Sequence, residues 1–423
     1  HQRNIWCSEV EGVSRIAIMS GAFQHEVLQR GSDTRAIHQD RSGRIWFSLR
    51  DRQIFIYDNR FNRIGYLTAD GRISPTPTTF GSPIYCFHED EDGVLWLGSR
   101  FDGLYRLLPI DENRYQVEQY RMKATDRYSL SDDNIYDIHR DRYGRLWVAT
   151  YGGGLNLVEE SGTKLRFLHA GNDLPFPVER HHQLRVIEET PHNIMLGSTN
   201  GLVYFPNREL SLDAIRFRSC EVQENGSGGL LSNDVRDIHY TSAGEIYLLT
   251  FSGGLSRVRM QGEEEPKFEH YTQKEGLPSE QVLSMIEDAN GGQWILSETF
   301  AFRFDPVNNH FETFGERYSG EDFYFSEAKP LLHGDYLLAG VSDGFCVVPT
   351  SETVSQFEPR LALTELTIEG QTERRGVGNL HEVRLKSHER DLQLSFTALD
   401  YVNPSSIRYA YRLEGENEAW QHL

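Results

Sequence analysis

A unit of about fifty residues recurs along this 423-residue chain and limits its possible folds more than any other feature. Each copy has an apolar stretch, a polar turn, and a second strand-like stretch that carries one large side chain. These large side chains stand 42 to 52 residues apart: Trp46, Trp96, Trp147, Met195, Tyr247, Trp294 and Tyr336. A period of this length is typical of β-propeller blades, so the seven copies predict seven blades.

Each unit has room for four short antiparallel strands and none for a helix, which predicts an all-β chain. We therefore expect a seven-bladed β-propeller. A half-copy at residues 5–16 precedes the first full unit, so an eight-bladed ring is the alternative. Four tryptophans recur in register, and we assign them a structural role in packing between blades: Trp46, Trp96, Trp147 and Trp294.

The chain divides into three predicted regions. Residues 1–30 are expected to be the remnant of an upstream blade, and residues 31–358 the propeller. A proline-marked junction then leads into residues 359–423, which we expect to be part of an immunoglobulin-like β-sandwich. Such a sandwich needs about 100 residues, and only about 65 remain, so the domain is predicted to be truncated.

The composition excludes several classes of partner. The chain has 43 Lys and Arg residues against 63 Asp and Glu residues, a formal net charge of −20. Because a polyanion repels nucleic acid, we expect no nucleic-acid partner for this region. No window approaches 18 consecutive apolar residues, and the N-terminus lacks a signal pattern. We therefore expect an excised piece whose membrane contact is made through a segment beyond residue 423.

Motifs that carry chemistry are scarce in this sequence. The four cysteines have neither zinc-site nor disulfide-scaffold spacing: Cys7, Cys86, Cys220 and Cys346. Carboxylate pairs recur at the same point of the repeat, which indicates turn formation rather than one catalytic site: Glu89-Asp90, Glu188-Glu189 and Glu287-Asp288. We predict no catalytic residue, no metal and no cofactor.

The blade pattern resembles the two-component regulator propeller repeat, best in residues 89–104, 141–155 and 275–294. The tail is similar to the three-tyrosine (Y_Y_Y) domain. The matching residues are Phe396, Ala398, Tyr401, Pro404, Tyr409, Tyr411, Leu413, Gly415 and Trp420. This order of domains is typical of the extracytoplasmic sensor region of a bacterial hybrid two-component system.

The resemblance implies the periplasmic part of an inner-membrane receptor that relays ligand binding to a histidine kinase. It implies that this chain is not itself an enzyme, although the full-length protein is one, and that the full-length protein self-associates. One alternative is the sensor half of a diguanylate-cyclase receptor. Others are a propeller-fold glycosidase or lyase, or a scaffold that binds only protein.

Two classes of loop should meet on one face of a propeller: those entering the first strand of each blade, and those following the strand that bears the large side chain. On this face we predict a binding site for a saccharide or another small ligand, since aromatic rings can stack on sugars and Arg can pair with acids. The predicted ligand-binding residues are Arg50, Arg100, Phe101, Tyr151, Arg180, His181, His182, Phe251 and Glu298. The same face also carries Arg35, Arg52, Asp133, Asn134, Asn200, Asp234, Glu280 and Phe300.

Overall fold

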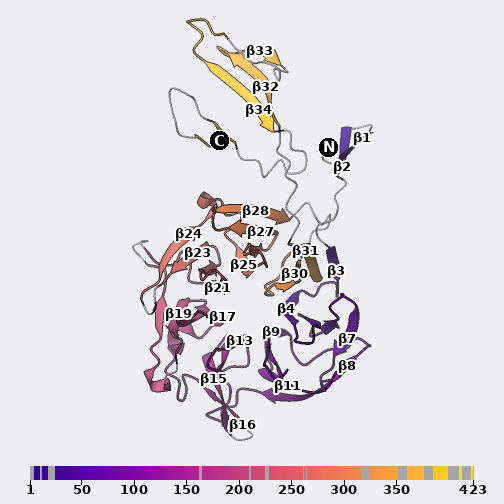
Figure 1. Cartoon of the computed structure of the whole chain (residues 1–423), viewed down its shortest axis with the longest axis vertical. Helices are drawn as coiled ribbons and strands as arrows, with labels where there is room; N and C mark the ends of the chain where they lie inside the picture. Colours follow the sequence, from indigo (N-terminus) through magenta and orange to yellow (C-terminus); the bar gives the residue numbers. More distant parts are fainter. Residues whose placement is uncertain are drawn as a thin grey trace. The chain divides into compact units, whose positions relative to one another are not determined.

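The computed structural model divides the chain into two compact units, Gly21–Ser351 and a second unit made of His1–Ser20 with Glu352–Leu423 (Figure 1). The structure describes residues 4–9, 12–17, 24–161, 164–208, 211–223, 228–260, 262, 264–315, 324–350, 360–375, 384–398, 409–411 and 421–422. No helix in these ranges is long and apolar enough to cross a membrane.

The first unit is a seven-bladed β-propeller of antiparallel sheets, and the eight-bladed alternative is excluded. Blade 1 contains β4 (Thr34–Gln39), β5 (Ile45–Leu49), β6 (Ile54–Tyr57), β7 (Arg63–Leu67) and β8 (Ile73–Ser74). Blade 2 contains β9 (Ile84–Glu89), β10 (Leu95–Ser99), β11 (Leu104–Asp111) and β12 (Arg114–Tyr120). Blade 3 contains β13 (Ile135–Arg140), β14 (Leu146–Thr150), β15 (Gly154–Ser161) and β16 (Lys164–Leu168). In blades 1 to 6 the first strand lies innermost, and in blades 1 to 5 it lies beside the first strand of the next blade.

Blades 4 to 6 repeat this order. Blade 4 contains β17 (Leu184–Glu189), β18 (Asn193–Ser198), β19 (Gly201–Pro206) and β20 (Arg218–Cys220). Blade 5 contains β21 (Val235–Tyr240), β22 (Ile246–Thr250), β23 (Gly254–Arg259) and β24 (Lys267–Tyr271). Blade 6 contains β25 (Val282–Glu287), β26 (Gln293–Ser297), β27 (Phe300–Asp305) and β28 (His310–Gly315). The described helical segments of the unit are short: α1 (Val178–His181), η1 (Leu212–Ala214) and η2 (Gln273–Glu275).

Blade 7 joins the two ends of the propeller chain. Its strands β29 (Leu331–His333), β30 (Tyr336–Val341) and β31 (Gly344–Pro349) are completed by β3 (Gln24–Val27), which pairs antiparallel with β31. The sequence analysis placed β3 within an upstream remnant, residues 1–30. The propeller instead begins before residue 31, because β3 supplies the outer strand that closes the ring.

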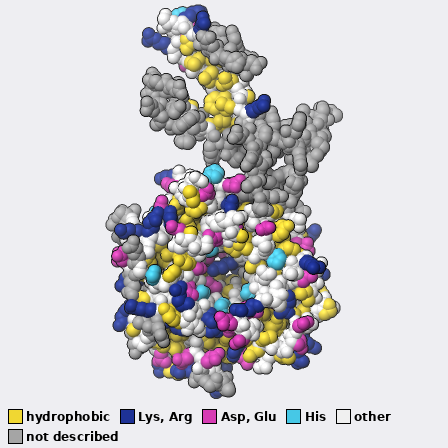
Figure 2. Space-filling view, viewed as in Figure 1, with side chains coloured by type: hydrophobic (Ala, Val, Ile, Leu, Met, Phe, Trp, Pro, Cys, Tyr) yellow, Lys and Arg dark blue, Asp and Glu magenta, His cyan; other side chains and the backbone are white. Residues whose placement is uncertain are grey.

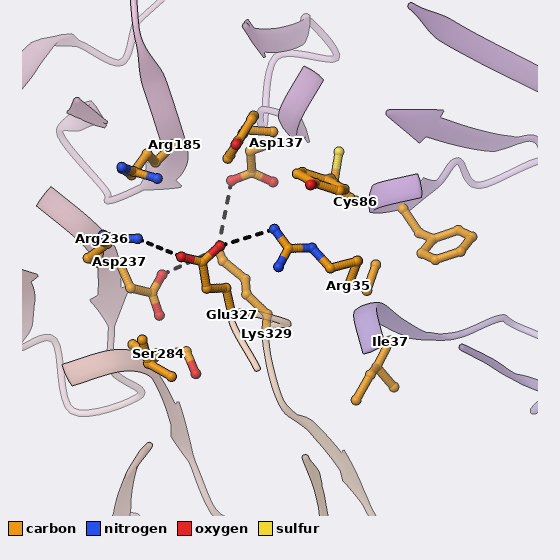
Figure 3. Close-up of a pocket in the computed structure, with 15 residues that line it drawn as sticks. Arg35, Ile37, Cys86, Asp137, Arg185, Arg236, Asp237, Ser284, Glu327 and Lys329 are labelled. Atoms are coloured by element: carbon orange, nitrogen blue, oxygen red, sulfur yellow. Dashed lines mark hydrogen bonds and ion pairs between the residues drawn. The ribbon is translucent and has the colours of Figure 1, made fainter. Parts of the chain in front are cut away.

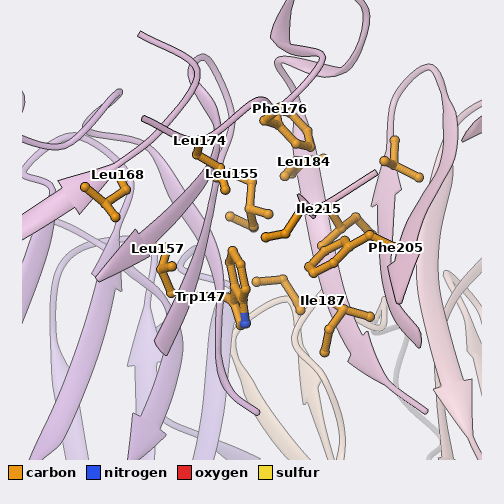
Figure 4. Close-up of a cluster of buried hydrophobic side chains, with 14 residues drawn as sticks. Trp147, Leu155, Leu157, Leu168, Leu174, Phe176, Leu184, Ile187, Phe205 and Ile215 are labelled. Atoms are coloured by element: carbon orange, nitrogen blue, oxygen red, sulfur yellow. The ribbon is translucent and has the colours of Figure 1, made fainter. Parts of the chain in front are cut away.

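Tryptophans fill the spaces between neighbouring blades. Trp46, Trp96, Trp147 and Trp294 are at most 1% exposed. Trp147 lies edge-on to Phe205 of blade 4, with ring centroids 5.2 Å apart, in a cluster that draws on both blades (Figure 4). Burying such large rings is a main source of stability in a unit whose described helical segments are too short to cover the faces of the sheets.

Each tryptophan is also held by the acidic residue six positions before it, and we call this contact the Asp–Trp pair. The indole Nε1 donates to a carboxylate oxygen at 2.7 to 3.0 Å in Asp40–Trp46, Asp90–Trp96, Asp141–Trp147 and Asp288–Trp294. The carboxylate of Asp141 also accepts the backbone N–H of Arg145 within the turn. Asp90 and Asp288 thus form turns, as predicted for the carboxylate pairs Glu89-Asp90 and Glu287-Asp288.

Blades without tryptophan replace both members of the pair. Thr190 precedes Met195 and Thr241 precedes Tyr247, and each threonine hydroxyl accepts a backbone N–H of its own turn. In blade 7 the expected large residue, Tyr336, is 44% exposed. The turn between β29 and β30 is shorter than the corresponding turn in other blades. Leu338, two residues after Tyr336, therefore takes the buried position that tryptophan has in other blades.

The second unit is all-β in its described part. It contains β1 (Asn4–Glu9) paired with β2 (Gly12–Ala17), the sheet of β32 (Leu361–Ile368), β33 (Gln371–Arg375) and β34 (Leu392–Ala398), and β35 (Ala410–Tyr411) paired with β36 (Gln421–His422). Tyr409 lies against Phe396, with centroids 5.5 Å apart, and its hydroxyl accepts the N–H of Ala398. Tyr401, Pro404, Leu413, Gly415 and Trp420 of the three-tyrosine pattern lie outside the described residues.

The Trp147→Ala substitution should lower the free energy of unfolding by about 3 to 5 kcal/mol, because it leaves a large cavity between blades 3 and 4. Chemical denaturation followed by intrinsic fluorescence measures the change. Tyr143→Ala in the preceding turn is the control, since Tyr143 is 45% exposed and its loss should change stability by less than about 0.5 kcal/mol. Equal unfolding midpoints for the two variants would contradict the assigned packing role.

Candidate functional site

Six innermost strands contain a β-bulge at the same repeat position. The second residue of β4, β9, β13, β17, β21 and β25 has no partner in the neighbouring strand, and the register shifts around it. A bulge re-aims the side chain that it carries, and here these side chains line the central channel. The six bulged residues are Arg35, Tyr85, Tyr136, Arg185, Arg236 and Leu283.

These residues line a cavity of about 140 Å³ within the propeller. Blade 7 adds Glu327 and Lys329, and the next residue of other inner strands adds Cys86, Asp137, Asp237 and Ser284. Figure 3 shows Glu327 at the centre of this group with arginines on two sides. Charged side chains also surround the hollow centre of the ring in the space-filling view (Figure 2).

Glu327 links three blades through its carboxylate. Its two oxygens accept Arg35 Nη2 at 3.1 Å and Arg236 Nη1 at 2.7 Å. Burial alone would raise the pKa of Glu327, but the guanidinium groups of Arg35, Arg236 and Arg185 outweigh burial and hold that pKa below its usual range. The carboxylate is therefore ionised at neutral pH.

Two aspartates hold the arginines from behind. Asp33 accepts Arg35 Nη1 at 2.9 Å, and Asp234 lies 3.3 Å from Arg236 Nε and 2.8 Å from Arg185 Nε. Asp33 and Asp234 stand at the same repeat position, directly before an inner strand. The hydrogen bonds of Arg35 and Arg185 and the ion pair of Arg236 hold these guanidinium groups by contacts that do not involve Glu327.

Lys329 forms a second charged layer. Its Nζ lies 3.7 Å from Asp137 and 3.5 Å from Asp237. Each of these aspartates also accepts a backbone N–H of the next blade, Asp137 from Ile187 and Asp237 from Met285, at 2.8 and 2.9 Å. Burial would lower the pKa of Lys329, but the two carboxylates outweigh it and raise that pKa. The lysine thus connects blades 3, 5 and 7 as a cation.

Aromatic rings line the wall of the channel, and their faces contact protein groups. Tyr136 stacks on Tyr151 at 4.7 Å and meets Tyr85 edge-on at 5.2 Å. The guanidinium of Arg35 lies 4.4 Å from the ring centroid of Tyr85, and that of Arg185 lies 5.2 Å from the centroid of Tyr151. The rings are therefore engaged by stacking and cation–π contacts.

The structure brings part of the predicted ligand face to this channel. The backbone N–H groups of Arg50, Arg100, Tyr151 and Phe251 each donate to the carbonyl of the residue just before an inner strand, at 2.8 to 3.0 Å. This bond joins the two loop classes expected to meet. Arg100 then donates to the Tyr85 hydroxyl at 2.8 Å, and Phe251 lies under the guanidinium of Arg236.

The remaining predicted residues lie farther from the cavity. Arg50 pairs with Asp33 rather than with the cavity, and Phe101, 57% exposed, lies beneath Arg100. None of the nine predicted ligand-binding residues is among the described residues that line the cavity, and Arg180, His181, His182 and Glu298 belong to connections between strands, away from it. Arg180 pairs with Glu221, while His182 and Glu298 are exposed.

His181 is the clearest departure from the expected ligand role. It ends the short helix α1 with its ring buried, and its Nδ1 lies 3.1 Å from the Ser198 hydroxyl. Burial lowers the pKa of His181, so its ring is neutral. It holds a loop rather than facing a ligand.

The sequence analysis missed most of the cavity. Of its lining only Arg35 stood on the predicted face, whereas Tyr85, Tyr136, Arg185 and Arg236 belong to strands. Aligning the repeats would have shown a polar or aromatic residue directly after the first apolar residue in four units, and Arg35 at the same position after Thr34 in the first unit. In the described part of the chain, no group of three or more His, Cys, Asp or Glu side chains is placed to hold a metal ion.

Comparisons with known proteins agree with the repeat. The family model described as two component regulator propeller matches residues 80–101 and 129–152, which cover the hairpins β9–β10 and β13–β14. The chain is 26% identical to Histidine kinase P4 of Formosa agariphila over 344 residues, 78% of this chain and 24% of that protein. The chain thus spans about a quarter of that curated relative.

Solved structures give a fold comparison. The WD40 β-propeller domain of Doa1 covers 79% of this chain and 97% of its own, with a TM-score of 0.50 and 12% identity, which shows the propeller fold alone. The extracellular domain of BT4673 from B. thetaiotaomicron covers 92% of this chain and 64% of its own, with a TM-score of 0.40 and 16% identity.

The ionisation of Glu188, beside Lys329, should make the stability of the propeller depend on pH. Burial raises the pKa of Glu188 from 4.5 to about 8, with Asp237 and Asp137 adding to the rise and Lys329 opposing it. Between these two values the folded state holds a proton that the unfolded chain has lost. The stability from this proton is complete below pH 4.5 and is lost as the pH rises to about 8.

The free energy of unfolding of the wild type should therefore fall as the pH rises from 5 to 8. Replacing Glu188 by Gln should reduce this slope by at most about 1.4 kcal/mol per pH unit. Urea titrations at pH 5, 6, 7 and 8 measure this slope. Glu245→Gln is the control, because the bond from Arg257 holds the pKa of Glu245 below its usual range and arginine does not titrate in this window, so the slope above pH 5 should not change. Parallel curves for Glu188→Gln and the wild type would show that Glu188 ionises normally.

Proposed function

Because two segments of the chain match the two component regulator propeller model and the chain is similar to a histidine kinase, we propose that it is the ligand-sensing part of a membrane-bound two-component receptor. It would lie outside the cytoplasm, as the periplasmic part of an inner-membrane protein. The kinase would be carried by the rest of the full-length protein, which would self-associate. A receptor that ends in a diguanylate cyclase is the alternative output.

The observation that carries this proposal is the group of bulged residues at the channel. Side chains from six blades converge on one cavity, and the repeat directs them there by a bulge at a fixed position. Bulges of this kind are over-represented next to functional sites. A saccharide or another small molecule bound at this cavity would contact several blades at once.

The contacts of the channel acids weigh against a glycosidase or lyase. A retaining or inverting mechanism needs two carboxyl groups directed at substrate. Asp137 and Asp237, which line the cavity, are both engaged by Lys329 and by backbone N–H groups. Glu327 is held by two arginines. Product formation from oligosaccharides incubated with the chain would support the enzyme instead.

A binding screen tests the sensor. We expect at least one member of a panel of mono- and oligosaccharides to raise the melting temperature of the purified chain. Arg100→Ala should then weaken binding of that saccharide by about 1.5 to 3 kcal/mol, since it removes a charged donor beside the channel. The same saccharide should change autophosphorylation of the full-length protein in membranes.

Arg180→Ala is the matched control for this experiment. Arg180 was predicted on the same face, but it pairs with Glu221 away from the cavity lining, so its loss should leave affinity unchanged. Calorimetry on both variants measures the difference. Equal weakening by the two substitutions would place the ligand on the outer loops, and an unresponsive kinase would refute the receptor.

A further inference from the structure

The charged groups at the channel differ in how firmly they are held. Arginines are held by acids outside the cavity lining, whereas Glu327 is held only through those arginines among the contacts described above. Arg35 and Arg236 are well buried, with 8% and 15% of their side chains exposed, and Asp33 and Asp234 hold them from behind. Glu327 is 44% exposed. If the carboxylate moved away, both guanidinium groups would keep their positions and present two buried sets of donors to the cavity.

The cations of the cavity lining direct several donors at one place, and some of the acids that offset their charge lie outside the lining. Its lining contains four cations, Arg35, Arg185, Arg236 and Lys329, against three carboxylates, Asp137, Asp237 and Glu327. Arg100 adds a further guanidinium beside Tyr85. Asp33 and Asp234, which pair with Arg35, Arg185 and Arg236 from outside the lining, bring the carboxylates to five, so the charges balance. The convergence of several buried donors on one place, rather than an excess of positive charge, favours an anion there.

The aromatic wall favours the same ligand class. A neutral sugar is held largely by stacking on an open ring face. Here Arg35 covers Tyr85, and Tyr151 covers Tyr136. The wall thus offers phenol and guanidinium donors more readily than a stacking platform.

We propose that the channel cavity binds an organic acid of about one sugar unit, whose carboxylate takes the place of Glu327 between Arg35 and Arg236. This assignment rests on the proposed sensor function and narrows its ligand class. In the absence of ligand, the carboxylate of Glu327 occupies the binding position itself and links blades 1, 5 and 7. The size follows from the volume, since about 140 Å³ lies below the roughly 300 to 1,000 Å³ of pockets for larger ligands.

D-glucuronate and D-glucose form a matched pair of probes, because they differ at one position by a carboxylate. Calorimetry with the purified chain should show binding of glucuronate and at least about tenfold weaker binding of glucose. Glu327→Gln removes the competing charge but keeps the shape, so it should tighten glucuronate binding about tenfold. Glu245→Gln is the control, because it alters another Glu–Arg pair, with Arg257, outside the cavity lining.

Two further measurements keep the test decisive. Melting curves test whether the Glu327→Gln variant is folded. If it is not, displacement of glucuronate from the wild type by inorganic sulfate tests whether the site binds anions. Sulfate that fails to compete, or a Glu327→Gln affinity equal to that of the wild type, overturns the inference. Glucose binding as tightly as glucuronate would overturn the ligand class yet leave a sensor of neutral sugars. A kinase unresponsive to every saccharide would instead refute the receptor itself.

Discussion

Packing of a large side chain between neighbouring blades is the interaction on which the rest of the propeller depends. A four-stranded sheet cannot cover both of its own faces, so each blade is stable only when the next one buries it. Trp147 does this from blade 3 against Phe205 of blade 4, and the Asp141 carboxylate fixes the orientation of its ring. Met195 and Leu338 fill the same place with less area, so the ring requires volume there rather than one residue type.

Ring closure gives blade 7 a special position. The strand β3 pairs with β31, so both ends of the propeller chain meet in this blade. The two charged residues that blade 7 sends into the channel, Glu327 and Lys329, bond to blades 1, 3 and 5. A change at the channel therefore acts on the blade from which the chain leaves the ring.

The sequence was sufficient to predict the repeat, the strands and the buried tryptophans, because these depend on period and polarity alone. It was insufficient for the channel, because a bulge adds one residue to one strand and changes which side chain faces inward. Strict alternation does not reveal that Tyr136 and Arg185 leave the ladder. His181 and His182 were both predicted to bind a ligand, yet the ring of His181, at the end of α1, is buried and that of His182 is exposed.

The acids of this chain explain how a strongly negative protein can keep a site for an anion. Asp33 and Asp234 do not neutralise the channel arginines from within the cavity; they hold Arg35 and Arg236 from the side of the entering loops. The carboxylates thereby offset the cost of burying each guanidinium while leaving its other donors directed at Glu327. Because the acid that orients each arginine is separate from the acid that occupies its remaining donors, one contact can be exchanged without loss of the other.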